Sequence, residues 1–112
     1  MWINIKFKDK RIKLGVRSTN LFTRFSGLMF KTKNTDNLIF NFNYYAKWSI
    51  HSLFVFFPFL ALWLDEQNNV LDFKIVKPFC LSIIPNKKFK KLIEIPVNEK
   101  NEKIIKIFLK KS

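Results

Sequence analysis

Residue types that carry proton transfer or metal binding are scarce in this sequence. His51 is the single histidine, Cys80 is the single cysteine, and the acidic residues are scattered. A metal site needs several ligands at characteristic spacings, and a general base needs a hydrogen-bonded partner beside an accessible pocket. The spacing of these residues indicates neither a set of metal ligands nor a general base with its partner. We therefore expect no metal and no cofactor, and a non-enzymatic protein is favoured over an enzyme.

Three residues are nevertheless candidates for a site. For His51, a hydrogen-bonded structural histidine is favoured over a base or a ligand contact. Arg24 lies near the end of a candidate helix, where a basic side chain is favourable without any bound anion. Glu94 lies between two isoleucines and is expected to pair with a lysine at the surface. Arg24 and His51 stay candidate contacts to an anion or ligand, and an enzyme with a site around His51, Arg24 and Glu94 stays an alternative.

The strongest binding candidate is the segment PNKKFKK. Its lysines could neutralise phosphates while the aromatic ring stacks on a base, and such binding would weaken steeply with salt. The chain has 3 arginines against 18 lysines, too few for much bidentate reading of bases. A solvated loop that protects an edge strand is the favoured alternative, and an anionic membrane surface would satisfy the same charges. The candidate contacts here are Lys87, Lys88, Phe89, Lys90 and Lys91.

The charge of the chain is concentrated at its two ends. The net charge is +13, with nine basic residues and one acid in 1–33, and nine basic residues and three acids in 87–112. Residues 34–86 are close to neutral. A charge of this size implies either an anionic partner, such as nucleic acid or an acidic membrane surface, or a strongly repelling surface, and a compositional bias toward lysine accounts for part of it. If the terminal segments lie side by side, one face of the molecule is positive.

Composition favours a cytoplasmic, single-domain protein. A chain of 112 residues with 48% hydrophobic content can bury one core. A lone cysteine allows no intramolecular disulfide. The first ten residues, MWINIKFKDK, alternate apolar and polar residues and do not resemble a secretory signal. We therefore expect one β domain over residues 1–112.

Alternating hydrophobicity predicts strands along most of the chain. WINIKF and IKLGV form a predicted hairpin. Its inward residues are Ile3, Ile5 and Phe7 in the first strand and Ile12, Leu14 and Val16 in the second. Further strands are predicted in LIFNF, VLDFKIV, CLSII, LIEIP and the tail KIIKIFLKK. A short helix is predicted in STNLFTRFSGLMF. This pattern indicates a mainly β fold: a small antiparallel sandwich or barrel, jelly-roll-like, with one short helix.

The apolar stretch SIHSLFVFFPFLALWLDE has two interpretations, as buried strands or as a membrane segment. Its 17 residues between Lys47 and Asp65 fall short of the ~20 that a membrane-spanning helix needs. Aromatic and β-branched residues favour two-sided burial in a sheet, and Pro58 opposes a continuous helix. We expect two consecutive core strands that meet at a bend near Pro58, closed by a DEQNN turn that Asp65 caps. A single-pass or peripheral membrane protein stays an alternative.

Several segments together resemble a known prokaryotic family. RFSGLMF, NLIFNF, SIHSLFVFFPFLALWLDEQNNV, KPF and KKLIEIP follow in the order seen in domain-of-unknown-function family 192. The resemblance covers roughly residues 16–96 and implies a compact antiparallel β fold with no established activity. The family's usual acid after the proline is replaced here by Leu60, and its usual Gly-Asp before the last strand is absent.

Overall fold

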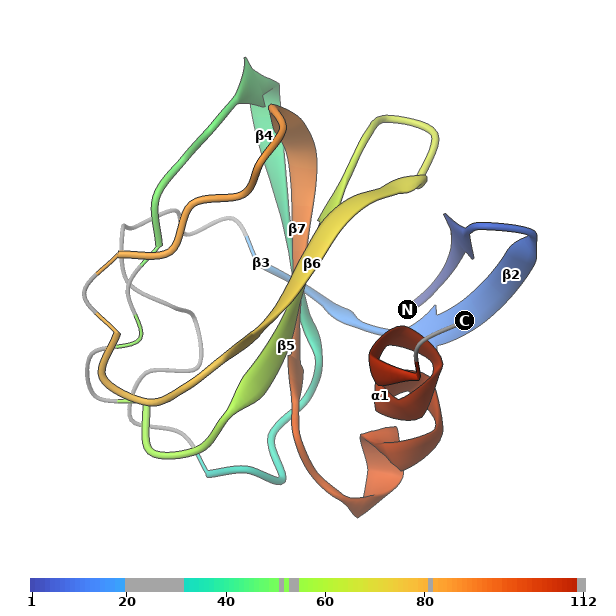
Figure 1. Cartoon of the computed structure of the whole chain (residues 1–112). Helices are drawn as coiled ribbons and strands as arrows, with labels where there is room; N and C mark the ends of the chain where they lie inside the picture. The colour runs from blue at the N-terminus through green and yellow to red at the C-terminus, as the bar shows by residue number, and fades with distance from the viewer. Residues whose placement is uncertain (20–31, 51, 53–54, 81, 111–112) are drawn as a thin grey trace.

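A computed structural model describes residues 1–19, 32–50, 52, 55–80 and 82–110 of the chain (Figure 1). In this part of the chain, strands dominate and one short helix lies at the C-terminal end. The elements are β1 (Trp2–Phe7), β2 (Lys10–Gly15), β3 (Arg17–Thr19), β4 (Leu38–Ala46), β5 (Phe59–Leu64), β6 (Val70–Val76), β7 (Phe89–Pro96), the 3-10 turn η1 (Glu99–Asn101) and α1 (Glu102–Leu109).

The strands form two sheets that do not close into a barrel. β1 and β2 make an antiparallel hairpin, and the larger sheet has the order β3-β4-β7-β5-β6. Every pairing in the larger sheet is antiparallel except that between β3 and β4. The expected mainly β fold with one short helix is confirmed.

The two central strands are covered on both faces. All six residues of β5, FLALWL, are buried, so the two-sided burial predicted for this stretch is confirmed. One face packs against the segments that lead from β4 to β5 and from β6 to β7, with Val55, Phe57 and Ile83 among its partners. The hairpin and α1 cover the other face, on the right of Figure 1. That second core contains Ile5, Leu14, Val16, Ile39, Leu60, Leu62, Leu64, Ile93, Ile95, Ile104, Ile105 and Phe108.

The strand predicted for the C-terminal tail is wrong, because these residues form α1. The buried side chains are Ile104, Ile105 and Phe108, which share one face of a helix and would lie on both faces of a strand. Asn98 caps the preceding turn η1 by accepting a hydrogen bond from the backbone of Asn101. Glu102 adds a negative charge in the first turn of α1, which favours a helix start.

Two other predicted elements differ in part. Of the two strands expected to meet near Pro58, the second forms as β5; the described residues between β4 and β5 form no strand and contain one bridge, between Ile50 and Ile83. In the described residues of the strand predicted in CLSII, this bridge is the only β pairing. A helix was predicted in STNLFTRFSGLMF. Its first two residues belong to β3 instead, and residues 20–30 lie outside the described residues. No helix in the described ranges is long and apolar enough to cross a membrane.

Candidate functional site

Two of the predicted site residues, Arg24 and His51, lie outside the described residues. The third, Glu94, is described, and the expectation that it pairs at the surface is wrong. Glu94 is 0% exposed, because β7 is a central strand and both of its faces are covered. The described residues contain no group of three or more His, Cys, Asp or Glu that could hold a metal ion.

Ser52, the neighbour of His51 in the sequence, has a structural role. Its hydroxyl donates to the carbonyl oxygen of Lys77 and accepts from the backbone N–H of Cys80, both at 2.7 Å. Backbone hydrogen bonds join the same two segments, from Ser52 to Cys80 and from Phe79 to Ser52. The Ser52 hydroxyl therefore links the segment between β4 and β5 to the segment between β6 and β7.

The segment PNKKFKK does not present its aromatic ring to solvent. Phe89 is 0% exposed at the start of β7, and its ring packs edge-on against Phe42 and Trp63, with centroid distances of 5.3 and 6.4 Å. A ring enclosed in this way cannot stack on a base, so Phe89 is a core residue. Phe89 belongs to the core on the first face of the sheet, although strict alternation from Ile93 and Ile95 would place it on the second face; the β4–β7 pairing is irregular at this point, between Asn41 and Ala46.

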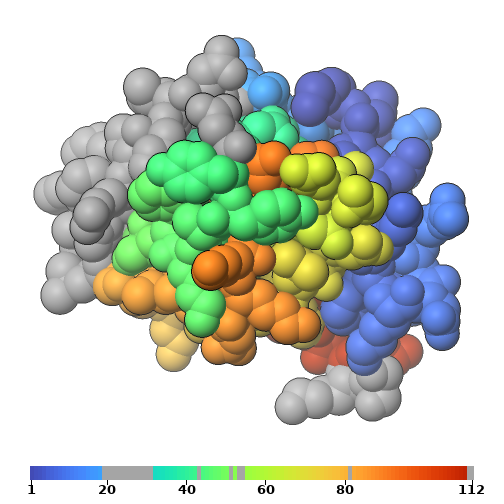
Figure 2. All heavy atoms as spheres, turned by 90° about the horizontal axis from the view of Figure 1, so that it is seen from above, coloured from blue at the N-terminus to red at the C-terminus, as the bar shows by residue number. Residues whose placement is uncertain are grey.

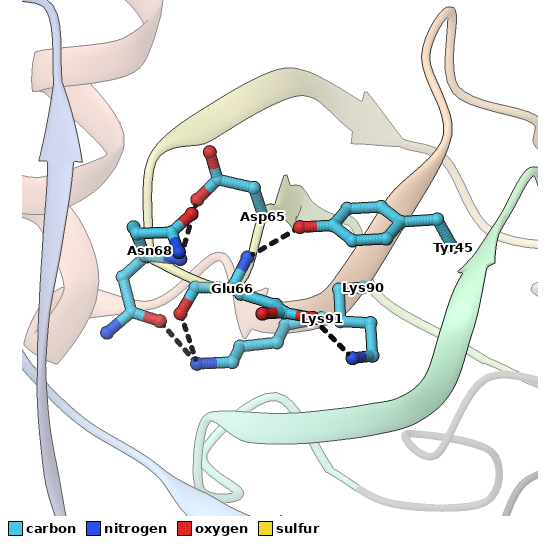
Figure 3. Close-up of polar contacts among 7 residues, drawn as sticks. Tyr45, Asp65, Glu66, Asn68, Lys90 and Lys91 are labelled. Atoms are coloured by element: carbon cyan, nitrogen blue, oxygen red, sulfur yellow. Dashed lines mark hydrogen bonds and ion pairs between the residues drawn. The ribbon is translucent and has the colours of Figure 1, made fainter.

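Lys90 and Lys91 are engaged by the turn between β5 and β6 (Figure 3). The Lys90 amine forms an ion pair with Glu66 at 2.8 Å and lies 5.6 Å from the ring centroid of Tyr45. The Lys91 amine donates to the side-chain oxygen of Asn68 at 2.7 Å. Both lysines therefore serve first to attach this turn to the sheet.

Asp65 organises that turn, as predicted. One of its carboxylate oxygens accepts hydrogen bonds from the backbone N–H groups of Gln67 and Asn69, both at 2.9 Å. The other accepts from the side-chain amide of Asn69 at 3.0 Å. The backbone of Lys6 in β1 donates to the carbonyl oxygen of Asn68, which attaches the hairpin to the same turn. In Figure 2 the turn (yellow), the end of β4 (green) and the 86–91 segment (orange) lie side by side, with the hairpin (blue) beside them.

Lys87 and Lys88 remain exposed at the turn before β7. Within the described ranges no hydrogen bond or ion pair engages either amine. The structure thus leaves two of the five predicted contacts in this segment available to an anion.

A groove of about 960 Å³ lies between the hairpin and α1, where the two basic ends of the chain meet. The terminal segments therefore lie side by side, although the C-terminal one is a helix. Apolar side chains line much of the groove, including Ile12 from β2 and Ile107 from α1. Its charged lining residues are Lys13, Arg17, Asp36, Lys100 and Lys103.

A chain of asparagine side chains holds the two walls of the groove together. The amide of Asn37 donates to the carbonyl oxygen of Gly15 at the end of β2, at 3.0 Å. The amide of Asn101 donates to the side-chain oxygen of Asn37 at 2.9 Å and to the carbonyl oxygen of Pro96 at 2.8 Å. Asn101 precedes α1 and makes no side-chain cap to it, so its side chain fixes the position of the helix against β2 and β7.

Trp2 lies at the hairpin end of the groove and is 69% exposed. It is paired with Gly15 across the hairpin, and its ring lies over that glycine, with Cζ3 3.5 Å from where a Cβ on Gly15 would stand. Lys13 is the diagonal neighbour on the same face, and its amine lies 5.2 Å from the ring centroid. The ring is thus held against the hairpin backbone, with the Lys13 amine over it, and most of the residue remains exposed to solvent.

The electrostatics of the groove favour anions. Four basic side chains line it against one acid, Asp36. Asp36 forms an ion pair with Arg17 at 3.6 Å, and both side chains are well exposed, so the pair is weak and screened. The arrangement offers apolar contact within the groove and positive charge from both β2 and α1.

The fold is similar to that of a solved protein of unknown function from Novosphingobium aromaticivorans DSM 12444. The TM-score is 0.68, with 12% sequence identity over 92% of this chain and 76% of that chain. At this identity the likeness shows the fold alone. No family model and no curated protein matches the sequence. The resemblance to domain-of-unknown-function family 192 stays a prediction.

The predictions from the sequence did not identify the residues that form the groove, although one of them, Trp2, has a partial signal in the sequence. Alternation that points Ile3 and Ile5 inward would put Trp2 on the outer face with Lys6, although this was not used to predict a site. No comparable signal marks Asn37 or Asn101, whose contact joins positions 64 residues apart. Their role depends on where α1 packs. It could not be predicted, because the C-terminal tail was predicted to be a strand.

Proposed function

We propose that this protein is a non-enzymatic binding module that receives an anionic partner in the groove between β2 and α1. The observation that carries the proposal is the meeting of the two basic ends of the chain at one groove, lined by four basic residues and one acid. Oppositely charged surfaces accelerate encounter and favour the correct partner.

The groove is a better anion site than the 86–91 segment on structural grounds. Phe89 is buried, and Lys90 and Lys91 are already bonded to the β5–β6 turn. An anion that took these lysines would have to replace existing contacts. Lys100 and Lys103 line the groove from η1 and α1, and neither makes a hydrogen bond or ion pair to a described residue.

Charge reversal at the groove tests the proposal. In a Lys100→Glu/Lys103→Glu variant we expect affinity for polyglutamate to fall about tenfold or more at low salt, because two cationic contacts are replaced by repulsive ones. Acidic residues are favourable in the first turn of a helix, so the exchange should not unfold α1. Affinity is measured by anisotropy of a labelled polyglutamate peptide over a range of salt concentrations.

The matched control is Lys87→Glu/Lys88→Glu, which changes the net charge equally at an exposed segment outside the groove. We expect it to lose only the part of the affinity that depends on overall charge. Equal losses in both variants would mean that binding follows total charge, and a larger loss in the control would place the site at the 86–91 segment. Either outcome would overturn the groove assignment.

Removing the acid from the groove is expected to strengthen binding. In Asp36→Asn the ion pair with Arg17 is lost and one negative charge leaves the lining, so the affinity for polyglutamate should rise about two- to fivefold at low salt. The gain should disappear at high salt, because the charges are exposed. Asp9→Asn removes the same charge from the β1–β2 turn, outside the groove. An equal gain in Asp9→Asn would contradict a local effect.

A further inference from the structure

We infer that the anion received by this groove is single-stranded nucleic acid, with a base stacked on the ring of Trp2. The inference rests on the proposed function and names its partner. Proteins that bind single strands without sequence preference combine exposed aromatic rings with cations that follow the backbone. The groove provides both at its hairpin end.

The position of Trp2 suits stacking. Its ring is supported over Gly15, where no side chain lifts it away from the hairpin, and it remains 69% exposed. A ring held in place in this way loses little conformational freedom when a base stacks on it. The cross-strand register therefore prepares a flat platform before any ligand arrives.

One cation lies over that platform, and others line the groove. The Lys13 amine is 5.2 Å from the ring centroid of Trp2, and Arg17 lines the groove beyond it on the same chain segment. Lys100 and Lys103 line the opposite wall. A stacked base at Trp2 thus places the attached phosphates beside positive side chains on both walls.

An anionic membrane fits the exposed apolar residues less well. A protein that binds the interface gathers its exposed apolar side chains on one side. Among the described residues, the exposed large apolar side chains come from the N-terminus and β1, the end of β4, the segments before β5 and after β6, and α1, although Phe56 and Phe79 contact each other: Met1, Trp2, Tyr44, Tyr45, Phe56, Phe79, Ile84 and Leu109. An acidic polypeptide would use the cations but has no need of the platform at Trp2.

A labelled dT12 oligonucleotide, a polyglutamate peptide and phosphatidylglycerol vesicles distinguish these partners. We expect the wild-type protein to bind dT12 at low salt and to lose affinity steeply as salt rises. Trp2→Ala should weaken dT12 binding about 5- to 150-fold, the range for removing one stacking contact, and should leave polyglutamate binding nearly unchanged. Tyr44→Ala removes another exposed aromatic side chain, on β4 outside the groove, and should bind dT12 as the wild type does.

A second measurement covers the case in which Trp2→Ala weakens the hairpin. Trp2→Phe keeps a ring over Gly15, so it should retain dT12 binding within about threefold while losing the quenching of tryptophan fluorescence that stacking on Trp2 causes. Trp63 is 0% exposed, and Trp48 is partly buried against the first core outside the groove, so neither is expected to be quenched. Unchanged quenching in Trp2→Phe would overturn the inference.

The outcomes separate the partner from the proposed function. Binding of polyglutamate without binding of dT12 would overturn the inference and leave the anion-binding groove in place. Binding of vesicles in preference to dT12 would overturn it in favour of a membrane surface. A wild-type affinity for dT12 in Trp2→Ala would show that the ring is not the platform. Failure to bind any of the three anions would overturn both proposals.

Discussion

Phe89→Ala is expected to lower the free energy of unfolding by about 3–5 kcal/mol, the cost typical of removing a fully buried aromatic ring. The ring is 0% exposed and packs against Phe42 and Trp63 between the central strand β7 and its neighbours. Alanine would leave a cavity that two large rings cannot fill without moving. Denaturation by urea, followed by tryptophan fluorescence, measures the change, since Trp63 lies beside the cavity.

Lys88→Ala is the control from the same segment. Its side chain is exposed, so we expect the free energy of unfolding to stay within about 0.5 kcal/mol of the wild type. If Phe89→Ala retained full stability and instead lost affinity for dT12, the ring would be a ligand contact. The sequence-based reading of PNKKFKK as a stacking site would then be correct.

Alternation of hydrophobic residues was enough to predict most of the strands. β1 coincides with the predicted segment WINIKF, because burial on one face gives the sequence a period of two. β6 coincides with VLDFKIV, but its burial is not one-sided, since Leu71 packs against the first core and Phe73 and Ile75 against the second. β5 was predicted from a different signal, an unbroken apolar run, which is typical of a strand buried on both faces. These signals are local and need no knowledge of the partner strands.

The C-terminal helix was missed because its short apolar pattern is ambiguous. Ile105, Ile107 and Leu109 alternate as in a strand, yet Leu109 is exposed, whereas Ile104 and Phe108 are buried. A helix buries the set at positions 104, 105 and 108 against the second core, and that larger burial decides the conformation. The acids in the first turns supported a helix start but are weak signals alone.

Glu94 shows how a correct strand can yield a wrong environment. Its place between Ile93 and Ile95 was read as one-sided burial, with the carboxylate in water. The strand β7 instead lies between β4 and β5, and segments far away in the sequence cover its other face. Strand order and the covering layers are properties of the whole fold, which a local pattern does not contain. The groove depends on the same kind of long-range contact.

Asn101→Ala is expected to lower the free energy of unfolding by about 2–4 kcal/mol, because it leaves one buried and one partly buried oxygen atom without their donor. The amide of Asn101 donates to the side chain of Asn37 and to the carbonyl oxygen of Pro96, and the residue is 7% exposed. Since Asn37 in turn holds Gly15, the substitution also loosens the two walls of the groove. Affinity for dT12, measured where the variant is fully folded, should fall as well.

Two further variants, Asn101→Asp and Asn98→Ala, test whether the amide donor of Asn101 is what holds α1 in place. Aspartate has nearly the same shape as asparagine but offers no amide donor, and it would direct a carboxylate at two acceptor oxygens, so we expect Asn101→Asp to destabilise at least as much as Asn101→Ala. Asn98 accepts from the backbone of Asn101 at a partly exposed cap, and its loss should cost only about 1 kcal/mol because water can replace it. A stable Asn101→Asp variant would show that shape alone holds α1 against β2, and that the asparagine chain does not determine the geometry of the groove.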